Sequence, residues 1–346
     1  MIKVLVVDDS AFMRLMIKDL LEKDPGIKVV DTAKNGIDAV EKAEKLRPDV
    51  IVMDVQMPEM DGLSALKMIC EKKLGKVLMV SSLTREGADV TLKALDLGAF
   101  DFVAKPGGSV LSDIKKFAEE MTAKVKAGVN AANLGEGKVK LPNSYPCSND
   151  EAKAVVIGVS TGGPRALMKV LPFLPHNINA AVFLVQHMPP SFTSSLAKRL
   201  DERCELKVVE AEDGMEVKPG TCYVGKGGYN MLVGGDRRRK KIVLTDVPKH
   251  RFMPSVEVTM DSVLALYREN TIGVLMTGMG DDGAEAMVRI RKAGGRTIAE
   301  SRETAVIYGM PRAAVEKGGA EFVLPNYEIA AKIIELVGVR EAYGAN

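Results

Sequence analysis

The hydrophobic and polar positions of the first third of the chain alternate between two periods. Short apolar runs that are typical of buried strands are separated by segments, such as 13–21 and 37–46, whose apolar residues recur at helical spacing. This order repeats with short loops, so we expect a parallel sheet between two layers of helices. The predicted strands are 4–7, 28–32, 50–53, 77–80 and 101–104.

The same α/β pattern returns after residue 152 and predicts a second doubly wound domain. Between residues 206 and 247, shorter apolar runs separated by glycine-containing turns predict antiparallel hairpins inserted into this domain. The other predicted strands are 154–159, 180–185, 272–277 and 297–299, and the predicted helices are 164–171, 191–203, 256–267, 282–293 and 327–337.

A change of composition separates the two α/β regions. Asn, Gly, Pro, Ser and Lys dominate from about residue 128 to 151, and no apolar periodicity remains there. The sequence therefore predicts a domain at 1–125, a flexible linker at 126–151 and a second domain at 152–346.

Composition and charge narrow the function classes. The formal net charge is +2, so no overall field favours nucleic acid or an anionic membrane surface. The basic run at 237–241 is interpreted as the solvated tip of a hairpin. The four cysteines show no CxxC spacing, which fits a reducing compartment. With no signal-peptide pattern and no apolar stretch near the ~20 residues that cross a bilayer, we expect a cytoplasmic protein without membrane insertion.

Acidic side chains lie at the ends of two predicted strands of the first domain. Asp8 and Asp9 follow the first strand, and Asp54 follows the third. These strand ends are neighbours in a doubly wound sheet, so the carboxylates should converge. Close like charges need a cation, and oxygen ligands of this kind suit Mg²⁺, which would neutralise a phosphoryl group attacked by Asp54.

Two further strand ends complete this first site. Lys105, followed by Pro106, can give a second positive contact, and Ser81 offers a hydroxyl to a phosphoryl oxygen. Any one of these residues could instead cap or terminate an element, but together they favour a functional pocket.

Over residues 1–125 the chain resembles the receiver domain of two-component response regulators. The matching features are Asp8-Asp9-Ser10, Met53-Asp54-Val55 with Met57-Pro58 and Asp61-Gly62 behind it, Ser81 and Lys105-Pro106. The resemblance implies a five-stranded flavodoxin-like fold, phosphorylation at Asp54 and a sensor histidine kinase as the donor.

The second domain carries a Gly-x-Ser-x-Gly sequence between a predicted strand and a helix. In Gly158–Gly162 this turn would expose the hydroxyl of Ser160 for nucleophilic attack. A serine needs a base, and the chain holds three histidines. His176 lies in a loop far from any strand end, and His250 lies between Lys249 and Arg251. His187 ends a buried strand, so it can reach Ser160, although a lone histidine there is ordinarily structural.

A carboxylate should orient the imidazole. The run Met276–Gly283 follows a predicted strand, and either Asp281 or Asp282 could turn back toward the site or simply cap the next helix. The backbone N–H groups of Thr161 and Met279 can form an oxyanion hole.

Over essentially its whole length the chain is similar to the chemotaxis methylesterase family (CheB). The motifs are Ser160-Thr161-Gly162-Gly163, Gln186-His187-Met188-Pro189-Pro190, Thr277-Gly278-Met279-Gly280 with Asp282-Gly283, and Tyr308-Gly309-Met310-Pro311. The resemblance implies that Ser160 is the nucleophile, His187 the base and Asp282 the orienting carboxylate. It also implies a substrate: glutamate methyl esters, and certain glutamines, of methyl-accepting chemotaxis receptors.

The expected protein is thus a phosphorylation-activated hydrolase, acting as a monomer, whose esterase chemistry needs no cofactor. Its unphosphorylated receiver is expected to cover the Ser160 edge. Two alternatives stay open: a non-enzymatic receiver-linked adaptor, and a phospho-regulated esterase or amidase acting on another substrate. A DNA-binding output is disfavoured because the second half is a full α/β domain without a small basic helical unit.

Overall fold

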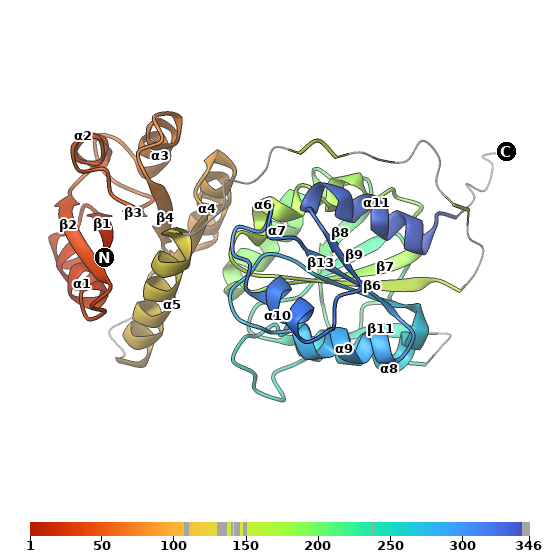
Figure 1. The fold of residues 1–346 in the computed structure, drawn as a ribbon. Helices are drawn as coiled ribbons and strands as arrows, with labels where there is room; N and C mark the ends of the chain where they lie inside the picture. Colours follow the sequence, from red (N-terminus) through yellow and green to blue (C-terminus); the bar gives the residue numbers. More distant parts are fainter. Residues whose placement is uncertain are drawn as a thin grey trace. The chain divides into compact units, whose positions relative to one another are not determined.

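A computed structural model describes residues 1–106, 111–129, 137–139, 141, 146–147, 151–236 and 239–340, except for the side chains at positions 85 and 112. Most of the predicted linker and part of the predicted 237–241 hairpin tip therefore lie outside the described residues. The chain divides into two compact units, Met1–Ala131 and Ala132–Asn346, shown in Figure 1.

The first unit is a five-stranded parallel sheet with the strand order β2-β1-β3-β4-β5. Helices α1 and α5 pack against each other on one face, while α2, α3 and α4 lie in sequence on the other. The strands are β1 (Ile2–Val7), β2 (Ile27–Ala33), β3 (Val50–Asp54), β4 (Lys76–Ser81) and β5 (Asp101–Ala104). The helices are α1 (Ala11–Leu21), α2 (Gly36–Leu46), α3 (Gly62–Glu71), α4 (Arg85–Leu97) and α5 (Leu111–Val129).

Local sequence accounts for these boundaries. The central strands β1 and β3 are almost wholly buried because helices cover both faces of the sheet. Ser10, Asn35 and Asp61 each accept a hydrogen bond from a backbone N–H of the first turn of the helix that follows, which fixes where α1, α2 and α3 begin. The five predicted strands are confirmed, each within two residues of its predicted ends.

The second unit contains a seven-stranded sheet with the strand order β14-β13-β12-β6-β7-β9-β8. All of its strand pairs are parallel. The strands are β6 (Lys153–Val159), β7 (Ala180–Gln186), β8 (Lys207–Glu210), β9 (Thr221–Val224), β12 (Thr271–Leu275), β13 (Arg296–Glu300) and β14 (Phe322–Leu324).

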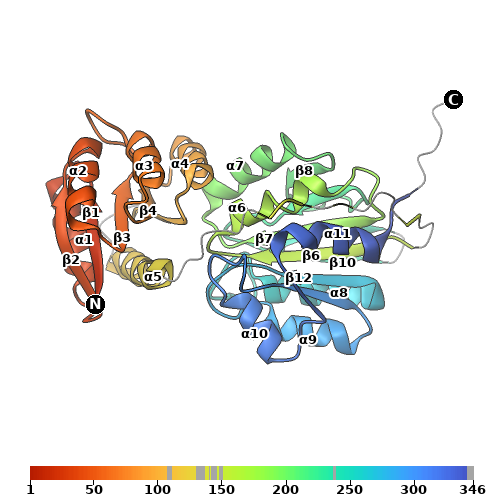
Figure 2. The ribbon, with the colours of Figure 1, turned by 45° about the horizontal axis from the view of Figure 1, so that its top comes forward.

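Helices cover both faces of this sheet. Figure 2 shows α6, α7 and α11 on one face and α8, α9 and α10 on the other. The core beneath α8 to α10 is a cluster of buried hydrophobic side chains that includes Phe183, Tyr223 and Tyr267. The helices are α6 (Gly163–Leu167), α7 (Pro190–Asp201), α8 (Val256–Tyr267), α9 (Ala284–Lys292), α10 (Met310–Glu316) and α11 (Asn326–Val337).

One prediction for the 206–247 region is confirmed and one is wrong. Strands β10 (Asn230–Gly235) and β11 (Lys240–Thr245) form an antiparallel hairpin that packs against α8. Strands β8 and β9, by contrast, pair in parallel at the edge of the main sheet. The connection 211–220 therefore leads from the carboxyl end of β8 back to the amino end of β9 instead of turning tightly, so the glycines of this region do not all mark hairpins.

The topology of each sheet places its predicted site residues at one edge. Connections leave β1 and β3 in opposite directions along the first sheet, and the same holds for β6 and β12 in the second. A crevice forms outside the carboxyl ends of strands at such a switch point, and ligands of open α/β sheets bind there. All the predicted site residues that follow β1, β3, β6 and β12 lie at these two switch points.

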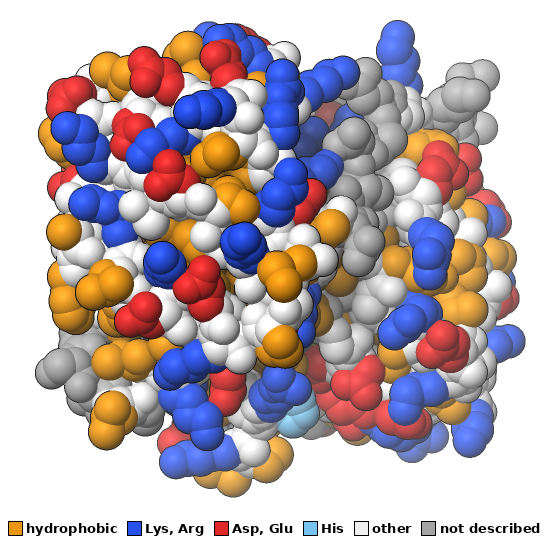
Figure 3. Space-filling view, turned by 60° about the vertical axis from the view of Figure 1, so that its left-hand side comes forward, with side chains coloured by type: hydrophobic (Ala, Val, Ile, Leu, Met, Phe, Trp, Pro, Cys, Tyr) orange, Lys and Arg blue, Asp and Glu red, His pale blue; other side chains and the backbone are white. Residues whose placement is uncertain are grey.

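Among the described residues, no helix is long and apolar enough to span a membrane. On the face drawn in Figure 3, Lys and Arg side chains are interspersed with Asp and Glu, and hydrophobic side chains are scattered between them.

Candidate active sites

The acidic pocket of the first unit is formed at the ends of β1 and β3. One carboxylate oxygen from each of Asp8, Asp9 and Asp54 lies within 4.8 Å of the others. Asp8 and Asp54 are buried, whereas Asp9 is exposed. Three hard oxygen donors on one side of a pocket open at Asp9 fit an octahedral Mg²⁺ that keeps several waters.

Lys105 lies over the buried carboxylates. Its Nζ is 3.0 Å from Asp8 Oδ2 and 2.9 Å from Asp54 Oδ2. Burial raises the pKa of Asp54, and the neighbouring ammonium of Lys105 opposes that rise. Burial also disfavours the charged form of Lys105, but its pairing with Asp54 and Asp8 outweighs this and raises its pKa. The lysine therefore stays charged and partly neutralises the pocket.

Ser81 is fully buried at the end of β4, and its hydroxyl faces α4. Ser81 Oγ lies 2.6 Å from Thr91 Oγ1 and 3.2 Å from the carbonyl oxygen of Gly87. Because a hydroxyl has one hydrogen, the predicted contact with a phosphoryl oxygen requires Ser81 to give up the hydrogen bond that it donates to Gly87. That contact stays a prediction.

The glycine-rich turn after β6 places Ser160 at the carboxyl edge of the second sheet. Gly162 has φ of +78°, and a Cβ there would meet Val306 at 2.6 Å, so the turn requires glycine. The backbone N–H of Ser160 donates to the carbonyl of Thr277 at 2.9 Å. Gln186 Nε2 donates to the carbonyl of Ser160 at 3.0 Å. The backbone of Ser160 is therefore held from both sides, by Thr277 just after β12 and by Gln186 at the end of β7.

His187 lies beside Ser160 because β6 and β7 are paired in register. Val159 pairs with Gln186, and the N–H of His187 donates to the carbonyl of Val159 at 3.2 Å. The imidazole stacks on Phe252, with ring centroids 4.3 Å apart and an interplanar angle of 11°. The strand register and the stacked ring together restrict the orientation of the histidine.

Asp282, rather than Asp281, turns back to the histidine. His187 Nε2 lies 2.8 Å from Asp282 Oδ2, and both side chains are buried, whereas Asp281 is exposed. A carboxylate only accepts, so His187 carries its proton on Nε2. Within the described part of the chain, His187 Nδ1 has no hydrogen-bond partner. The free lone pair of the imidazole is therefore on Nδ1.

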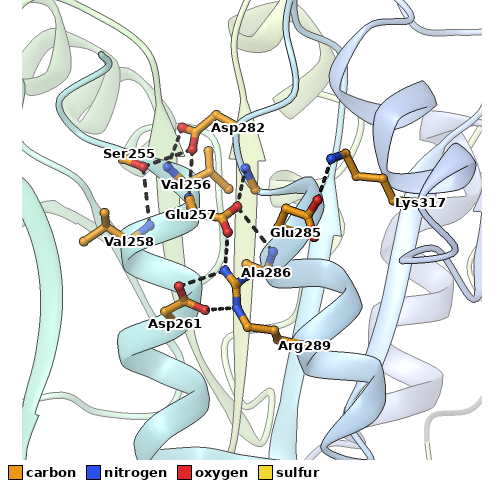
Figure 4. A network of polar contacts seen from close by, with 11 residues as sticks. Ser255, Val256, Glu257, Val258, Asp261, Asp282, Glu285, Ala286, Arg289 and Lys317 are labelled. Atoms are coloured by element: carbon orange, nitrogen blue, oxygen red, sulfur yellow. Dashed lines mark hydrogen bonds and ion pairs between the residues drawn. The ribbon is translucent and has the colours of Figure 1, made fainter. Parts of the chain in front are cut away.

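The start of α8 holds the carboxylate of Asp282. It accepts hydrogen bonds from Ser255 Oγ at 3.0 Å and from the backbone N–H groups of Val256 at 2.8 Å and Glu257 at 3.0 Å, as Figure 4 shows. Burial acts to raise the pKa of Asp282, but His187 and the two backbone donors outweigh it and lower the pKa. The group is ionised at neutral pH.

Sequence reasoning missed Ser255 and Phe252 as contacts of Asp282 and His187, and it named Gln186 only as part of a motif. Ser255 does carry a signal, because it immediately precedes the predicted helix 256–267 and serine is a preferred N-cap. The other side chains reach the site from loops, strand ends or neighbouring elements whose direction depends on the tertiary fold.

The other two histidines have different partners. His176 is exposed, with Nδ1 3.8 Å from Glu205 Oε2, and His250 Nδ1 accepts from the N–H of Phe252 at 3.4 Å. The backbone N–H groups of the predicted oxyanion residues, Thr161 and Met279, have no acceptor among the described residues. They are therefore available to a substrate oxygen.

Comparison with known proteins finds a matching family for each of the two units. The CheB methylesterase family model matches residues 155–333, and the response regulator receiver domain model matches residues 4–114. The protein-glutamate methylesterase/protein-glutamine glutaminase 3 of Syntrophomonas wolfei is 51% identical, covering 97% of this chain and 99% of its own. The chain belongs to the CheB family.

Two comparisons with Thermotoga maritima extend this likeness. A protein-glutamate methylesterase/protein-glutamine glutaminase is 46% identical, with 97% of this chain and 98% of the relative covered. The crystal structure of the CheB methylesterase catalytic domain is 46% identical and has a TM-score of 0.53, covering 54% of this chain and 100% of that structure. This CheB protein thus combines both domains of its family.

Proposed function

We propose that this protein hydrolyses glutamate methyl esters, and deamidates specific glutamines, of chemotaxis receptors, and that phosphorylation of its receiver activates it. The observation that carries the proposal is the buried His187–Asp282 pair, which lies beside a serine on a glycine-rich turn in a chain of the CheB family.

The proton transfers follow from the histidine tautomer. Because Nε2–H is bonded to Asp282, Nδ1 is the atom that takes the proton of Ser160 as Oγ attacks the ester carbonyl. Asp282 stabilises the resulting imidazolium. The same proton then goes to methoxide, which leaves as methanol, or to the departing nitrogen of a glutamine, which leaves as ammonia. Water attacks the acyl-enzyme by the same route and releases glutamate.

The tetrahedral intermediate carries a negative oxygen, and the N–H groups of Thr161 and Met279 are the donors we assign to it. Thr161 is buried and Met279 partly buried, so water competes little for these donors. Loss of one oxyanion donor typically costs about 3–4 kcal/mol in the transition state.

Asp54 is the phosphoacceptor that we assign to the receiver. Asp8, Asp9 and Asp54 would hold Mg²⁺, which when bound neutralises charge on the transferring phosphoryl group. Lys105 pairs with the same group, and Ser81 donates to a phosphoryl oxygen in place of the Gly87 carbonyl. Because Gly87 lies in the first turn of α4, this exchange would alter the start of that helix.

The partners follow from the family. A chemotaxis histidine kinase donates the phosphoryl group, chemoreceptors are the substrate, and the protein works in the cytoplasm as a monomer. No nucleic-acid partner or cofactor for the esterase chemistry is part of the proposal.

The proposal is tested by incubating the protein with receptor membranes that carry radiolabelled methyl groups, with and without a small phosphodonor. Release of labelled methanol should rise with the phosphodonor and fall by a factor of about 10⁴ or more in Ser160→Ala, because that variant lacks the nucleophile. Ser64→Ala, at an exposed serine of α3 in the first unit, is a matched control outside the esterase site. Demethylation by Ser160→Ala at the wild-type rate would refute the mechanism.

A further inference from the structure

Glu300 is a fully buried carboxyl at the end of β13, outside the Ser160–His187–Asp282 set. Its Oε2 accepts the backbone N–H of Thr277 at 2.7 Å, and its Oε1 accepts the hydroxyl of Thr304 at 2.9 Å. Thr304 Oγ1 in turn accepts the N–H of Asn326 at 2.9 Å. A buried carboxylate must be bonded in this way because leaving it unpaired is costly.

Thr277 connects this carboxyl to the nucleophile. Its carbonyl accepts the N–H of Ser160, and its hydroxyl donates to the carbonyl of Thr161 at 2.9 Å. The following residue, Gly278, is so close that a Cβ there would lie 2.8 Å from Ser160 Cβ. The position of the Thr277 backbone therefore determines where Ser160 can lie.

The groups around Glu300 favour ionisation only weakly. The three that hydrogen-bond to it, from the end of β12 (Thr277), the loop after β13 (Thr304) and the start of α11 (Asn326), are all uncharged. Burial raises the pKa of Glu300 to about 7, against these hydrogen bonds. When ionised, the carboxylate can accept from all three donors; a proton on it displaces one of them.

We propose that ionised Glu300 is a positioning residue, which through Thr277 holds Ser160 and its oxyanion donors in the reactive arrangement. This inference rests on the proposed role of Ser160 as the nucleophile. Glu300 itself touches no substrate. The ionised carboxylate fixes the Thr277 backbone by accepting its N–H. Without it, that N–H loses its acceptor and the backbone is no longer fixed.

The test uses a fluorophosphonate, which Ser160 Oγ attacks at phosphorus with loss of fluoride, so no receptor is required. Second-order labelling rates of the full chain are measured from pH 6 to 9. Glu300→Gln should label about 10- to 100-fold more slowly than wild type at pH 8.5, since small displacements at a nucleophile have effects of this size. The ratio of the wild-type rate to the Glu300→Gln rate should shrink several-fold at pH 6, where Glu300 of the wild type is mostly protonated and therefore uncharged like the glutamine.

The ratio of the wild-type rate to the Glu300→Gln rate separates this role from a structural one, because any pH dependence that both proteins share cancels in it. A ratio near 1 at every pH, or one that does not change with pH, overturns the positioning role. Glu303→Gln, an exposed carboxyl in the same loop, should label as wild type does. Ser160→Ala labelled as fast as wild type would overturn the proposed function instead.

Thr304→Val gives a second readout that keeps the carboxyl. Loss of the Thr304 hydroxyl removes a donor that favours the carboxylate, so the pH at which labelling changes should move upward from its wild-type position. An unmoved midpoint in a folded Thr304→Val protein would also overturn the inference.

Discussion

At the scale of single residues, Asp282 is the most constrained side chain of the esterase site. Four donors surround its two oxygens: His187, Ser255 and the N–H groups of residues 256 and 257. We expect Asp282→Asn to lower kcat by roughly 10³- to 10⁴-fold, because an amide turns an N–H toward one of these donors and destabilises the tautomer with the Nδ1 lone pair. Demethylation kinetics of receptor membranes measure this effect.

Asp281→Asn is the matched control for that change. Asp281 is exposed and adjacent in sequence, so its variant should retain the wild-type kcat. Equal losses of kcat in both variants would mean that the conformation of the loop, rather than the carboxylate of Asp282, orients His187.

The same residues show which site positions a sequence can reveal. Ser160 and His187 end strongly apolar runs, so their approach follows from the parallel pairing of two predicted strands. The pattern alone did not separate Asp281 from Asp282, since only the turn of the backbone after β12 decides which carboxylate faces inward. Glu300 and Phe252 could not be assigned, because their partners lie on loops or distant elements.

At the scale of elements, the first turns of α8 and α9 cap each other. Asp282, which precedes α9, accepts N–H groups of α8, and Glu257 of α8 accepts the N–H groups of Gly283 and Ala286 at 3.1 and 3.3 Å. Arg289 binds both Glu257 and Asp261, as Figure 4 shows. An acidic side chain near a helix N-terminus stabilises that helix, so each helix fixes the start of the other.

We expect Glu257→Ala to lower kcat for demethylation by about 10-fold with little change in KM, because it releases the Gly283 end of the Asp282 loop. The free energy of unfolding should fall by about 1–2 kcal/mol, the usual cost of a lost cap. Steady-state kinetics and urea unfolding measure the two effects. Glu216→Ala removes a carboxylate of the exposed Glu216–Lys218 pair, which lies outside any helix, and should change neither. An unchanged kcat in Glu257→Ala would contradict the coupling of α8 to Asp282.

Element boundaries were predictable where local chemistry sets them. The predicted helix 256–267 matches α8 because Ser255 caps it. The predicted strand 272–277 is too long: β12 ends at Leu275 because the N–H of Thr277 bonds to Glu300 instead of a neighbouring strand. The parallel pairing of β8 with β9 could not be read from short apolar runs, since hairpins and crossovers have the same local pattern.

At the scale of the whole molecule, two complete α/β sheets each carry a site at their own switch point. Composition indicates where one domain gives way to the next, but a polar, aperiodic segment says nothing of how the domains dock. The strength of the coupling between phosphorylation of Asp54 and reaction at Ser160 is set by how much phosphorylation stabilises the active state relative to the inactive one. A tenfold activation needs about 1.4 kcal/mol of differential stabilisation, whereas a switch from 1:99 to 99:1 needs about 5.5 kcal/mol.

If the unphosphorylated receiver covers the Ser160 edge, deleting residues 1–150 should raise basal demethylation and abolish its response to a phosphodonor. A relative 46% identical to this chain has been crystallised as a catalytic domain, so the fragment is expected to fold. Asp54→Asn in the full chain is the matched control: it should keep basal activity and lose only the activation. Specific activity in the folded fragment at or below that of the unphosphorylated full chain would contradict occlusion. That result would favour a receiver that contributes directly to receptor binding, because deleting a domain lowers activity only if the domain had promoted it.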